Sequence, residues 1–376
     1  MVRLKSLGLR GFRSIRSLPV LALRPLNVLI GANGSGKSNL IGFFKLLNWM
    51  TPVPGNLQSH IAMLGGANSI LHDGAAVSPQ IEADLTFETE SGKNQYYMRL
   101  FHAAQDTVIF AEEKYRYSAF AVGGQAGWQE LGSGHRESAL GKAAAAGDTT
   151  ARFILNALKR CVVYQFHNTS ATARLKQRWS LDDNYFLKED AANLAPFLYR
   201  LREEKPEYYG RITATIRQIA PFFADFELQP SGGTVILQWR ERGADLIFGP
   251  HQASDGSLRL CALLTLLLQP EEQLPALIIL DEPELGMHPF AINVIAGLLR
   301  SVSTRSQVML ATQSMTLLEH FEPEEIIVVD RPDRESLFRR LEAQDLKEWL
   351  EEYSLPELWE KNIIGGRPRR VEGIVH

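Results

Sequence analysis

The segment from Gly31 to Ser38 reads Gly-Ala-Asn-Gly-Ser-Gly-Lys-Ser and fits the phosphate-loop pattern GxxxxGK[ST] at every fixed position. In such a loop, successive backbone N–H groups surround the phosphates of a nucleotide, and the lysine, here Lys37, neutralises the β and γ oxygens. The hydroxyl of the last residue is a ligand for Mg²⁺. This segment therefore predicts binding of a nucleoside triphosphate with magnesium.

Two adjacent carboxylates follow a second apolar run much later in the chain. The run from Ala276 to Leu280 ends in Asp281 and Glu282, as a buried parallel strand that delivers carboxylates to a nucleotide site does. Asp281 would hold Mg²⁺, and Glu282 would polarise the attacking water as a general base. A solvated turn or a helix cap explains such a pair in isolation, but the upstream phosphate loop favours the catalytic interpretation.

A third polar segment, Ser254-Asp255-Gly256-Ser257, precedes a long apolar stretch that ends at Leu268. A hydroxyl and glycine turn at the start of a helix presents free N–H groups and the positive end of the helix dipole, which together attract anions. An ordinary serine N-cap is the alternative. The order of the three segments along the chain favours the anion site.

The elements that must position these residues follow from periodicity. Leu26–Ile30 reads as a buried strand before the loop, and residues 39–47 have apolar side chains at helical spacing. Strand-like segments dominate residues 1–30 and about 80–130, whereas helical spacing dominates residues 193–226. The glycine- and alanine-rich stretch 132–147 predicts a loop.

Taken together, the order of motifs resembles the stand-alone bacterial ABC-type ATPases related to RecF and SMC. The resemblance implies an α/β P-loop NTPase fold of the ABC-ATPase type, with a mixed central sheet, an antiparallel β subdomain and a lateral helical insert. The expected units are a nucleotide-binding lobe at 1–178, the helical insert at 179–228, a signature and Walker B lobe at 229–335, and a C-terminal tail packed on the core at 336–376.

The resemblance also assigns residues. It implies that ATP is the nucleotide and that the 254–257 signature contacts the γ-phosphate held by a second copy, so that two chains enclose two ATP molecules. Gln313, at the end of a strand over 307–312, takes the place of a switch histidine; it cannot take up a proton at neutral pH, which suits slow hydrolysis. The expected site residues are Arg13, Asn33, Gly34, Ser35, Gly36, Lys37, Ser38, Asn39, Ser254, Gly256, Ser257, Asp281, Glu282 and Gln313.

One family position remains open in the sequence. Relatives have a glutamine loop that reaches Mg²⁺ and the attacking water, and the strand-like segment 161–170 is where it is expected. Gln165, His167 and Asn168 all qualify.

Composition limits the classes of function. The 376 residues are 45% hydrophobic with a net charge of −3, which argues against a uniformly basic nucleic-acid wrapper. Arg339-Arg340 and the cluster at 367–370 are candidates for a local basic strip that binds DNA. No secretory or membrane-spanning run is visible, and the two cysteines predict neither a metal site nor a disulfide, so we expect a cytoplasmic protein.

The motifs predict an ATP-binding and ATP-hydrolysing switch, and the family resemblance alone implies that it acts in DNA maintenance or anti-phage defence. Long coiled-coil arms are not expected because no sustained heptad repeat occurs between the phosphate loop and the signature. The segment after Gln313 is too short for an appended nuclease domain, so a separately encoded effector such as a nuclease is expected. The alternatives are the motor of a membrane transporter, against which the Glu284–His288 continuation argues, and a structural module that scarcely turns over ATP.

Overall fold

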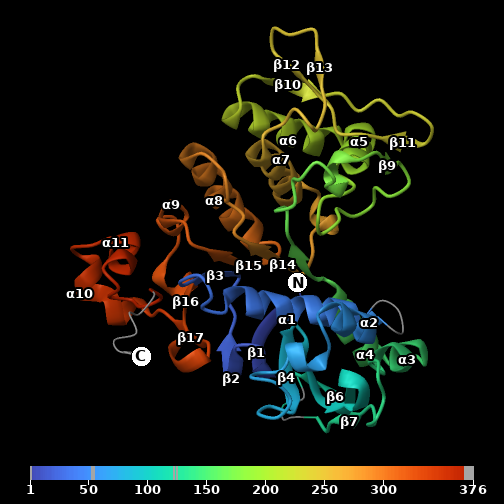
Figure 1. Cartoon of the computed structure of the whole chain (residues 1–376), viewed down its shortest axis with the longest axis vertical. Coiled ribbons are helices and arrows are strands. Elements are labelled where there is room, and N and C mark those ends of the chain that lie inside the picture. The colour runs from blue at the N-terminus through green and yellow to red at the C-terminus, as the bar shows by residue number, and fades with distance from the viewer. Residues whose placement is uncertain (1, 52–55, 122, 124–125, 368–376) are drawn as a thin grey trace, which may run out of the picture.

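The computed structural model describes residues 2–51, 56–121, 123 and 126–367. Its centre is a six-stranded sheet of order β17-β16-β3-β15-β14-β8, in which only β17 runs antiparallel to its neighbour (Figure 1). The strands are β3 (Leu26–Ile30), β8 (Cys161–Tyr164), β14 (Leu277–Asp281), β15 (Gln307–Thr312), β16 (Ile326–Asp330) and β17 (Leu337–Arg340). The predicted strands before the phosphate loop and before Asp281 are therefore neighbours of β15 on its two sides.

A second six-stranded sheet is antiparallel and has the order β2-β1-β4-β5-β6-β7. Its strands are β1 (Arg3–Phe12), β2 (Ile15–Ala22), β4 (Gln80–Glu88), β5 (Gly92–Ala103), β6 (Thr107–Ala119) and β7 (Gln129–Glu130). Helix α1 (Lys37–Met50) lies between this sheet and the central one (Figure 1). Phe43 and Phe44 on α1 are fully buried there, so the helix that follows the phosphate loop is held from both sides.

The central strands bury both of their faces, as expected for parallel strands covered by helices. In β3, Leu29 faces the layer of α1, whereas Val28 and Ile30 face a second hydrophobic core. That core also contains α7 (Asp255–Leu268) and α8 (Pro289–Ser303). Successive side chains point to opposite faces of a strand, which explains how one short apolar run serves two cores.

A lobe of helices and short strands packs against α7 at the top of Figure 1. It contains α5 (Leu194–Glu204), α6 (Pro206–Ile219), the three-stranded sheet β10-β12-β13 and the pair β11-β9. Their bounds are β9 (Trp179–Ser180), β10 (Phe223–Phe226), β11 (Thr234–Val235), β12 (Trp239–Glu241) and β13 (Ile247–Phe248). The helical pattern predicted for 193–226 thus ends in a strand, because residues 223–226 pair with β12.

The other helices are α2 (Asn56–Met63), α3 (Leu140–Ala145), α4 (Thr149–Lys159), α9 (Met315–Leu318), α10 (Lys347–Leu350) and α11 (Leu355–Glu360). The predicted loop at 132–147 was wrong in part, because α3 forms there and buries Leu140 and Ala144 in the core that contains α4. In the described part of the chain, no helix has both the length and the apolar character needed to cross a bilayer. The fold class predicted from the sequence is confirmed, whereas the four domain boundaries stay a prediction.

Candidate nucleotide site

The phosphate loop joins the end of β3 to the start of α1, in the order that the motif requires. Gly36 has φ of 114°, and a Cβ there would lie 2.0 Å from the Ser336 Oγ. Gly34, at the tip of the loop, has φ of 77° with no heavy atom within 4 Å of a Cβ position. Gly36 is therefore required by both conformation and space, and Gly34 by conformation alone.

Lys37 is buried inside the loop rather than extended into solvent. Its Nζ donates to the carbonyl oxygens of Gly31 at 2.6 Å and Ala32 at 3.1 Å. Burial lowers the pKa of Lys37, and the carboxylates of Glu282 and Asp281 partly oppose that shift. The oxygens of a bound phosphate can replace these two carbonyls. Because phosphate oxygens are negatively charged, they accept stronger hydrogen bonds from the ammonium group than neutral carbonyls do.

Ser38 and Asp281 lie close enough for the serine hydroxyl to donate to the carboxylate. Burial is the main cause that raises the pKa of Asp281, while the Ser38 hydrogen bond and Lys37 act in the opposite direction. Among the described residues, no group of three or more His, Cys, Asp or Glu side chains could hold a metal ion. One hydroxyl and one carboxylate fit Mg²⁺, which keeps several waters and takes phosphate oxygens as further ligands.

Glu282 begins the turn after β14 with φ of 42°, a region that costs energy for a residue other than glycine. Its N–H donates to the Ala311 carbonyl at 2.8 Å, and its carboxylate accepts a hydrogen bond from the Gln313 amide. The same Gln313 Nε2 donates to Asn33 Oδ1 at 2.7 Å. One side chain thus connects the tip of the phosphate loop with the expected general base.

Glu284 is a polar residue of the site that has no role in the sequence prediction. It is buried and accepts a hydrogen bond from the Thr312 hydroxyl, while its Oε2 has no hydrogen-bond partner among the described residues. Burial raises the pKa of Glu284, and the nearby Glu282 charge adds to the shift. The acid two residues after Glu282 was visible in Asp-Glu-Pro-Glu, but the turn that buries its side chain has no periodic signal.

Two predicted nucleotide ligands have other contacts in this structure. Arg13, with φ of 49°, places its guanidinium 5.5 Å from the Phe12 ring centre and beside Gly42 of α1. No hydrogen bond joins that guanidinium to the phosphate loop in the described residues. Asn39 donates its side-chain amide to Ser14 Oγ at 2.6 Å, so it fixes the first strands against α1.

Ser336 contacts the phosphate loop from outside, and no sequence motif indicates this contact. Its hydroxyl donates to the Ser35 carbonyl at 2.6 Å and lies 2.6 Å from Ser14 Oγ. Arg331 donates to the Gly34 carbonyl at 3.1 Å. The buried hydroxyl of Ser35 itself has no hydrogen-bond partner among the described residues. Isolated serine and arginine residues between strands carry no pattern that identifies such a clamp.

The three candidates for the glutamine loop lie after β8, which is the neighbour of β14. Gln165 accepts a hydrogen bond from Lys45 of α1. His167 Nε2 lies 2.7 Å from the Asp281 carbonyl, and Asn168 bonds to Ser170. All three follow Tyr164, which pairs with Leu280 at the acidic end of β14. The choice between them stays open.

The signature residues occupy the N-terminus of α7, away from the phosphate loop. Ser254 is the N-cap: its Oγ accepts from the Ser257 N–H at 3.1 Å and lies 2.8 Å from the Ser257 hydroxyl. A Cβ on Gly256 would lie 2.5 Å from the Gly286 carbonyl. Within the described ranges, no hydrogen bond connects residues 254–257 with residues 31–38.

Arg259 connects the signature helix with the two loops beside Asp281. Its guanidinium donates to the Leu285 carbonyl at 3.2 Å and to the His167 carbonyl at 3.1 Å. Since His167 also contacts the Asp281 backbone, a displacement of α7 would reach the expected ion site through two contacts.

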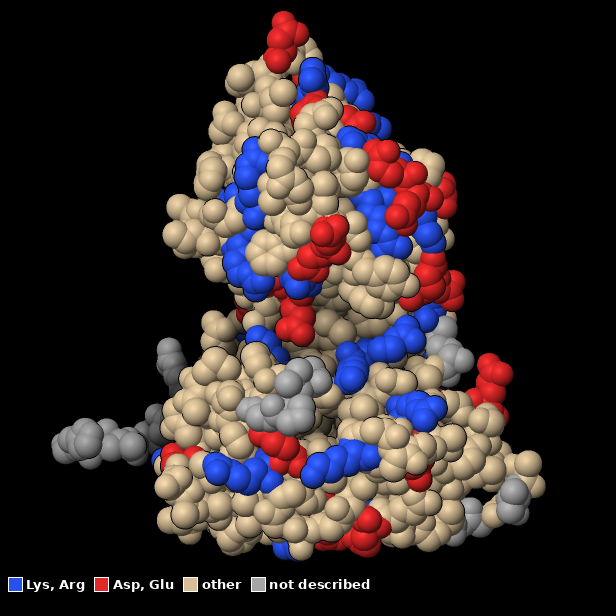
Figure 2. All heavy atoms as spheres, turned by 90° about the vertical axis from the view of Figure 1, so that its right-hand side faces the viewer, with Lys and Arg blue, Asp and Glu red and all other residues tan. Residues whose placement is uncertain are grey.

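The basic clusters offered for DNA have structural contacts where they are described. Arg340 donates to the carbonyls of Glu324 and Ala22, and burial lowers its pKa to about 10. Arg339 donates to the Ile364 carbonyl. The 367–370 cluster lies outside the described residues apart from Arg367. Figure 2 shows the side away from β17, and basic and acidic side chains are mixed there. A DNA-binding strip stays a prediction.

Comparison with solved structures shows the fold. The chain is similar to the SMC head bound to the C-terminal winged-helix domain of ScpA, with 16% identity and a TM-score of 0.61, over 92% of this chain and 99% of the other. It is also similar to a Pyrococcus furiosus Smc head domain with an extended coiled coil, bound to the C-terminal domain of ScpA. That match has 17% identity and a TM-score of 0.54, over 94% and 99% of the two chains.

A search of the curated proteins finds no match. A family model described as "AAA domain, putative AbiEii toxin, Type IV TA system" matches residues 26–121 and 149–319, which include the phosphate loop, the signature segment and the Asp281-Glu282 pair. Because these two ranges make up more than half of the sequence, the chain belongs to this AAA-domain family of ATPases, with the fold of SMC heads.

Proposed function

We propose that the chain binds ATP with Mg²⁺ at residues 31–38 and hydrolyses it slowly. The observation that carries the proposal is the Gln313 side chain, which bonds to both Asn33 of the loop and the Glu282 carboxylate. Groups for the phosphates, the ion and the water therefore meet at the carboxyl ends of β3, β14 and β15, where ligands of open α/β sheets bind. Magnesium would neutralise charge on the phosphates between Ser38 and Asp281.

The protein groups then have separate tasks. Lys37 exchanges the Gly31 and Ala32 carbonyls for phosphate oxygens, and the loop N–H groups bind the remaining charge. Glu282 accepts a proton from the attacking water, while Gln313 fixes the direction of its carboxylate. Because a glutamine amide does not titrate, it holds the base without serving as an acid or base itself.

We further propose that two copies close around two ATP molecules. The argument is that Ser254 is exposed and that the signature makes no hydrogen bond to its own phosphate loop in the described residues, although its capped helix start is suited to an anion. A second copy would bring this surface to the γ-phosphate. Hydrolysis would then remove the contact and reopen the pair.

The cellular role that we propose is DNA maintenance or defence against foreign DNA, with a separate effector protein. The family description names a toxin of a type IV toxin–antitoxin system, and the similar SMC heads are described as bound to ScpA. Both facts support an ATPase that works through a protein partner.

The test is the solution mass of Glu282→Gln by light scattering, with and without ATP and Mg²⁺. This variant keeps the shape of the base but cannot accept the proton, so we expect 42.1 kDa without ATP and twice that mass with it. The double variant Lys37→Ala/Glu282→Gln is the control and should stay a monomer. A mass that ATP leaves unchanged would contradict closure between two copies.

Single-turnover hydrolysis by the unchanged protein separates a switch from a structural ATP module. Release of phosphate that Glu282→Gln slows by about a hundredfold or more supports general-base catalysis. ATP that stays intact in the unchanged protein would instead favour the structural module.

A further inference from the structure

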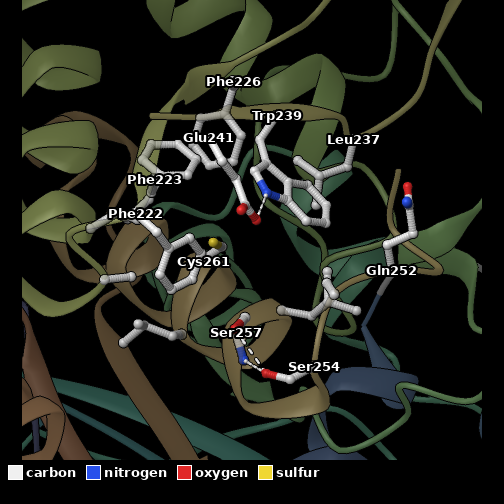
Figure 3. Close-up of a pocket in the computed structure, with 15 residues that line it drawn as sticks. Phe222, Phe223, Phe226, Leu237, Trp239, Glu241, Gln252, Ser254, Ser257 and Cys261 are labelled. Carbon is white, nitrogen blue, oxygen red and sulfur yellow. Dashed lines mark hydrogen bonds between the residues drawn. The ribbon is translucent and has the colours of Figure 1, made fainter. Parts of the chain in front are cut away.

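A cavity of about 310 Å³ lies beside the signature, outside the candidate nucleotide site (Figure 3). Its walls come from four elements, and all the lining residues fall within 216–261: the end of α6, the adjoining strand β10, the strand β12 and the first turns of α7. The volume is at the lower end of the range for small-molecule sites. The chemistry proposed at residues 31–38 does not involve this cavity, although Ser254 and Ser257 of the proposed dimer contact form part of its wall.

Aromatic side chains dominate one side of the cavity. The antiparallel pairing of β10 with β12 sets Phe226 opposite Trp239 and Phe223 opposite Glu241, so that these four residues share one region of the wall. Phe222 adds a ring at the rim and remains 51% exposed. The rim of the cavity thus presents an aromatic face that a ligand can contact.

One carboxylate lies among these rings. Trp239 Nε1 donates to Glu241 Oε1 at 3.3 Å, and Figure 3 shows both groups directed into the cavity. In the part of the chain that the structure describes, no lysine or arginine forms an ion pair with Glu241. A carboxylate beside aromatic faces attracts a cation, because the faces of the rings also carry negative potential.

The floor of the cavity is the signature itself. Ser254 and Ser257 line it together with Leu258 and Cys261 of α7. The start of α7 at this floor is the anion-suited end that we assign above to the γ-phosphate. Glu241 lies instead among the aromatic rings, where its charge favours a cation.

We propose that this cavity binds a small organic cation, an ammonium group carried on an aromatic or aliphatic body. The ammonium lies against Glu241 and the rings of Phe223, Phe226 and Trp239, while the body fills the apolar remainder beside α6. The site is a binding site of its own and does not require ATP. Because the cavity borders the signature, a ligand bound there changes the ATP concentration that the proposed dimer requires.

Three probes of nearly equal size test the ligand class: phenethylammonium, 2-phenylethanol and phenylacetate. Ligand-observed NMR and calorimetry with the full chain should show phenethylammonium binding about five- to tenfold more tightly than 2-phenylethanol, and phenylacetate most weakly. In Glu241→Gln, phenethylammonium should lose this advantage while 2-phenylethanol binding stays unchanged. Glu207→Gln, an exposed acid on α6, is the matched control.

A second variant protects against a folding defect in the first. Phe222→Ala removes a half-exposed ring, and we expect it to weaken all three probes without changing the melting temperature. Equal affinities of the three probes, a preference that survives in Glu241→Gln, or no binding at all would each overturn the proposed site.

The effect on the switch rests on the proposed function and has its own readout. Saturating phenethylammonium should shift the ATP concentration at which Glu282→Gln dimerises by at least threefold, and this shift should vanish in Glu241→Gln. Direct binding without such a shift would reject the coupling but keep the site. A failure of Glu282→Gln to dimerise would contradict the proposed function and leave the binding result intact.

Discussion

The phosphate-loop end and the signature end of this chain differ in how far their polar groups are already satisfied. At the loop, Lys37 bonds to two carbonyls, and Gln313 and Ser336 each bond to the loop from another element. At the signature, the hydroxyls of Ser254 and Ser257 bond to each other within one helix start. The first region is held by contacts from several elements, whereas the second is held within one helix start, where we propose that a second copy binds.

The difference follows from the elements that carry the two regions. The loop, Glu282 and Gln313 follow three adjacent parallel strands, whose pairing fixes their relative positions. The signature begins a helix below a separate lobe, next to an open cavity. We therefore expect changes at the loop to abolish nucleotide binding and changes at the signature to spare it.

The largest expected effect is that of Lys37→Ala on ATP affinity. Removing a buried ammonium that binds phosphate oxygens should weaken ATP binding by about a hundredfold or more, in calorimetry or with a fluorescent ATP analogue. Lys347→Ala, which removes an exposed lysine of α10, should bind ATP as the unchanged protein does. Tight ATP binding by Lys37→Ala would place the nucleotide elsewhere.

Two alanine substitutions at glycines compare the regions directly. In Gly36→Ala, the new methyl group collides with Ser336 at a φ of 114°, so ATP binding should be lost and stability should fall by about 2 kcal/mol. In Gly256→Ala, the methyl group meets the Gly286 carbonyl and displaces the loop after Glu282. We expect ATP affinity within about twofold of normal but no ATP-dependent dimer.

Both glycine variants are measured by ATP binding and by light scattering in the Glu282→Gln background. The contrast between the regions would be lost if Gly256→Ala bound ATP as poorly as Gly36→Ala, since that result would make the signature part of the site within one chain.

A smaller effect is expected from Gln313→Ala. The base keeps its chemistry but loses the amide that directs it, so the hydrolysis rate should fall by about tenfold while ATP affinity changes little. Gln313→Glu is the informative companion, because it places a second negative charge beside Glu282 and should slow hydrolysis further. Unchanged rates in both variants would remove Gln313 from the site.

The smallest effect concerns stability and pH. Burial raises the pKa of Glu284 above its ordinary value of 4.5, so the folded state favours the protonated carboxyl, and stability is lost as the pH rises from 4.5 through the raised pKa. Glu284→Gln removes this titration, so its unfolding free energy relative to the unchanged protein should increase over that window and then level off. Urea unfolding at several pH values measures it, with Glu207→Gln as control.

The fold and the centre of the site were predictable because strands and motifs have local signals. The apolar runs before the phosphate loop and before Asp281 identified two central strands, and Gln313 was placed correctly at the end of a third. The site roles themselves remain predictions that the variants above test. Local patterns could not show that α3 forms at 140–145, because its apolar face depends on packing with α4 and not on caps or periodicity alone.

The remaining contacts were unpredictable for a related reason. Ser336 and Arg331 act through carbonyls of a loop about 300 positions away, and any serine or arginine could do so. Arg13 stays a predicted nucleotide contact from the family resemblance, and in this structure its guanidinium lies beside Gly42 of α1. Single side chains at bends have no periodicity that sequence reasoning can use.

The Ser14–Ser336 contact joins residues 322 positions apart, and Ser336 also supports the loop at Ser35. Such distant contacts form only after most of the chain is available. During synthesis, a ribosome-bound chain that has not yet released Ser336 from the exit tunnel lacks the outer support of its phosphate loop. For the proposed ATP site, we therefore expect firm nucleotide binding only after residue 336 has left the exit tunnel.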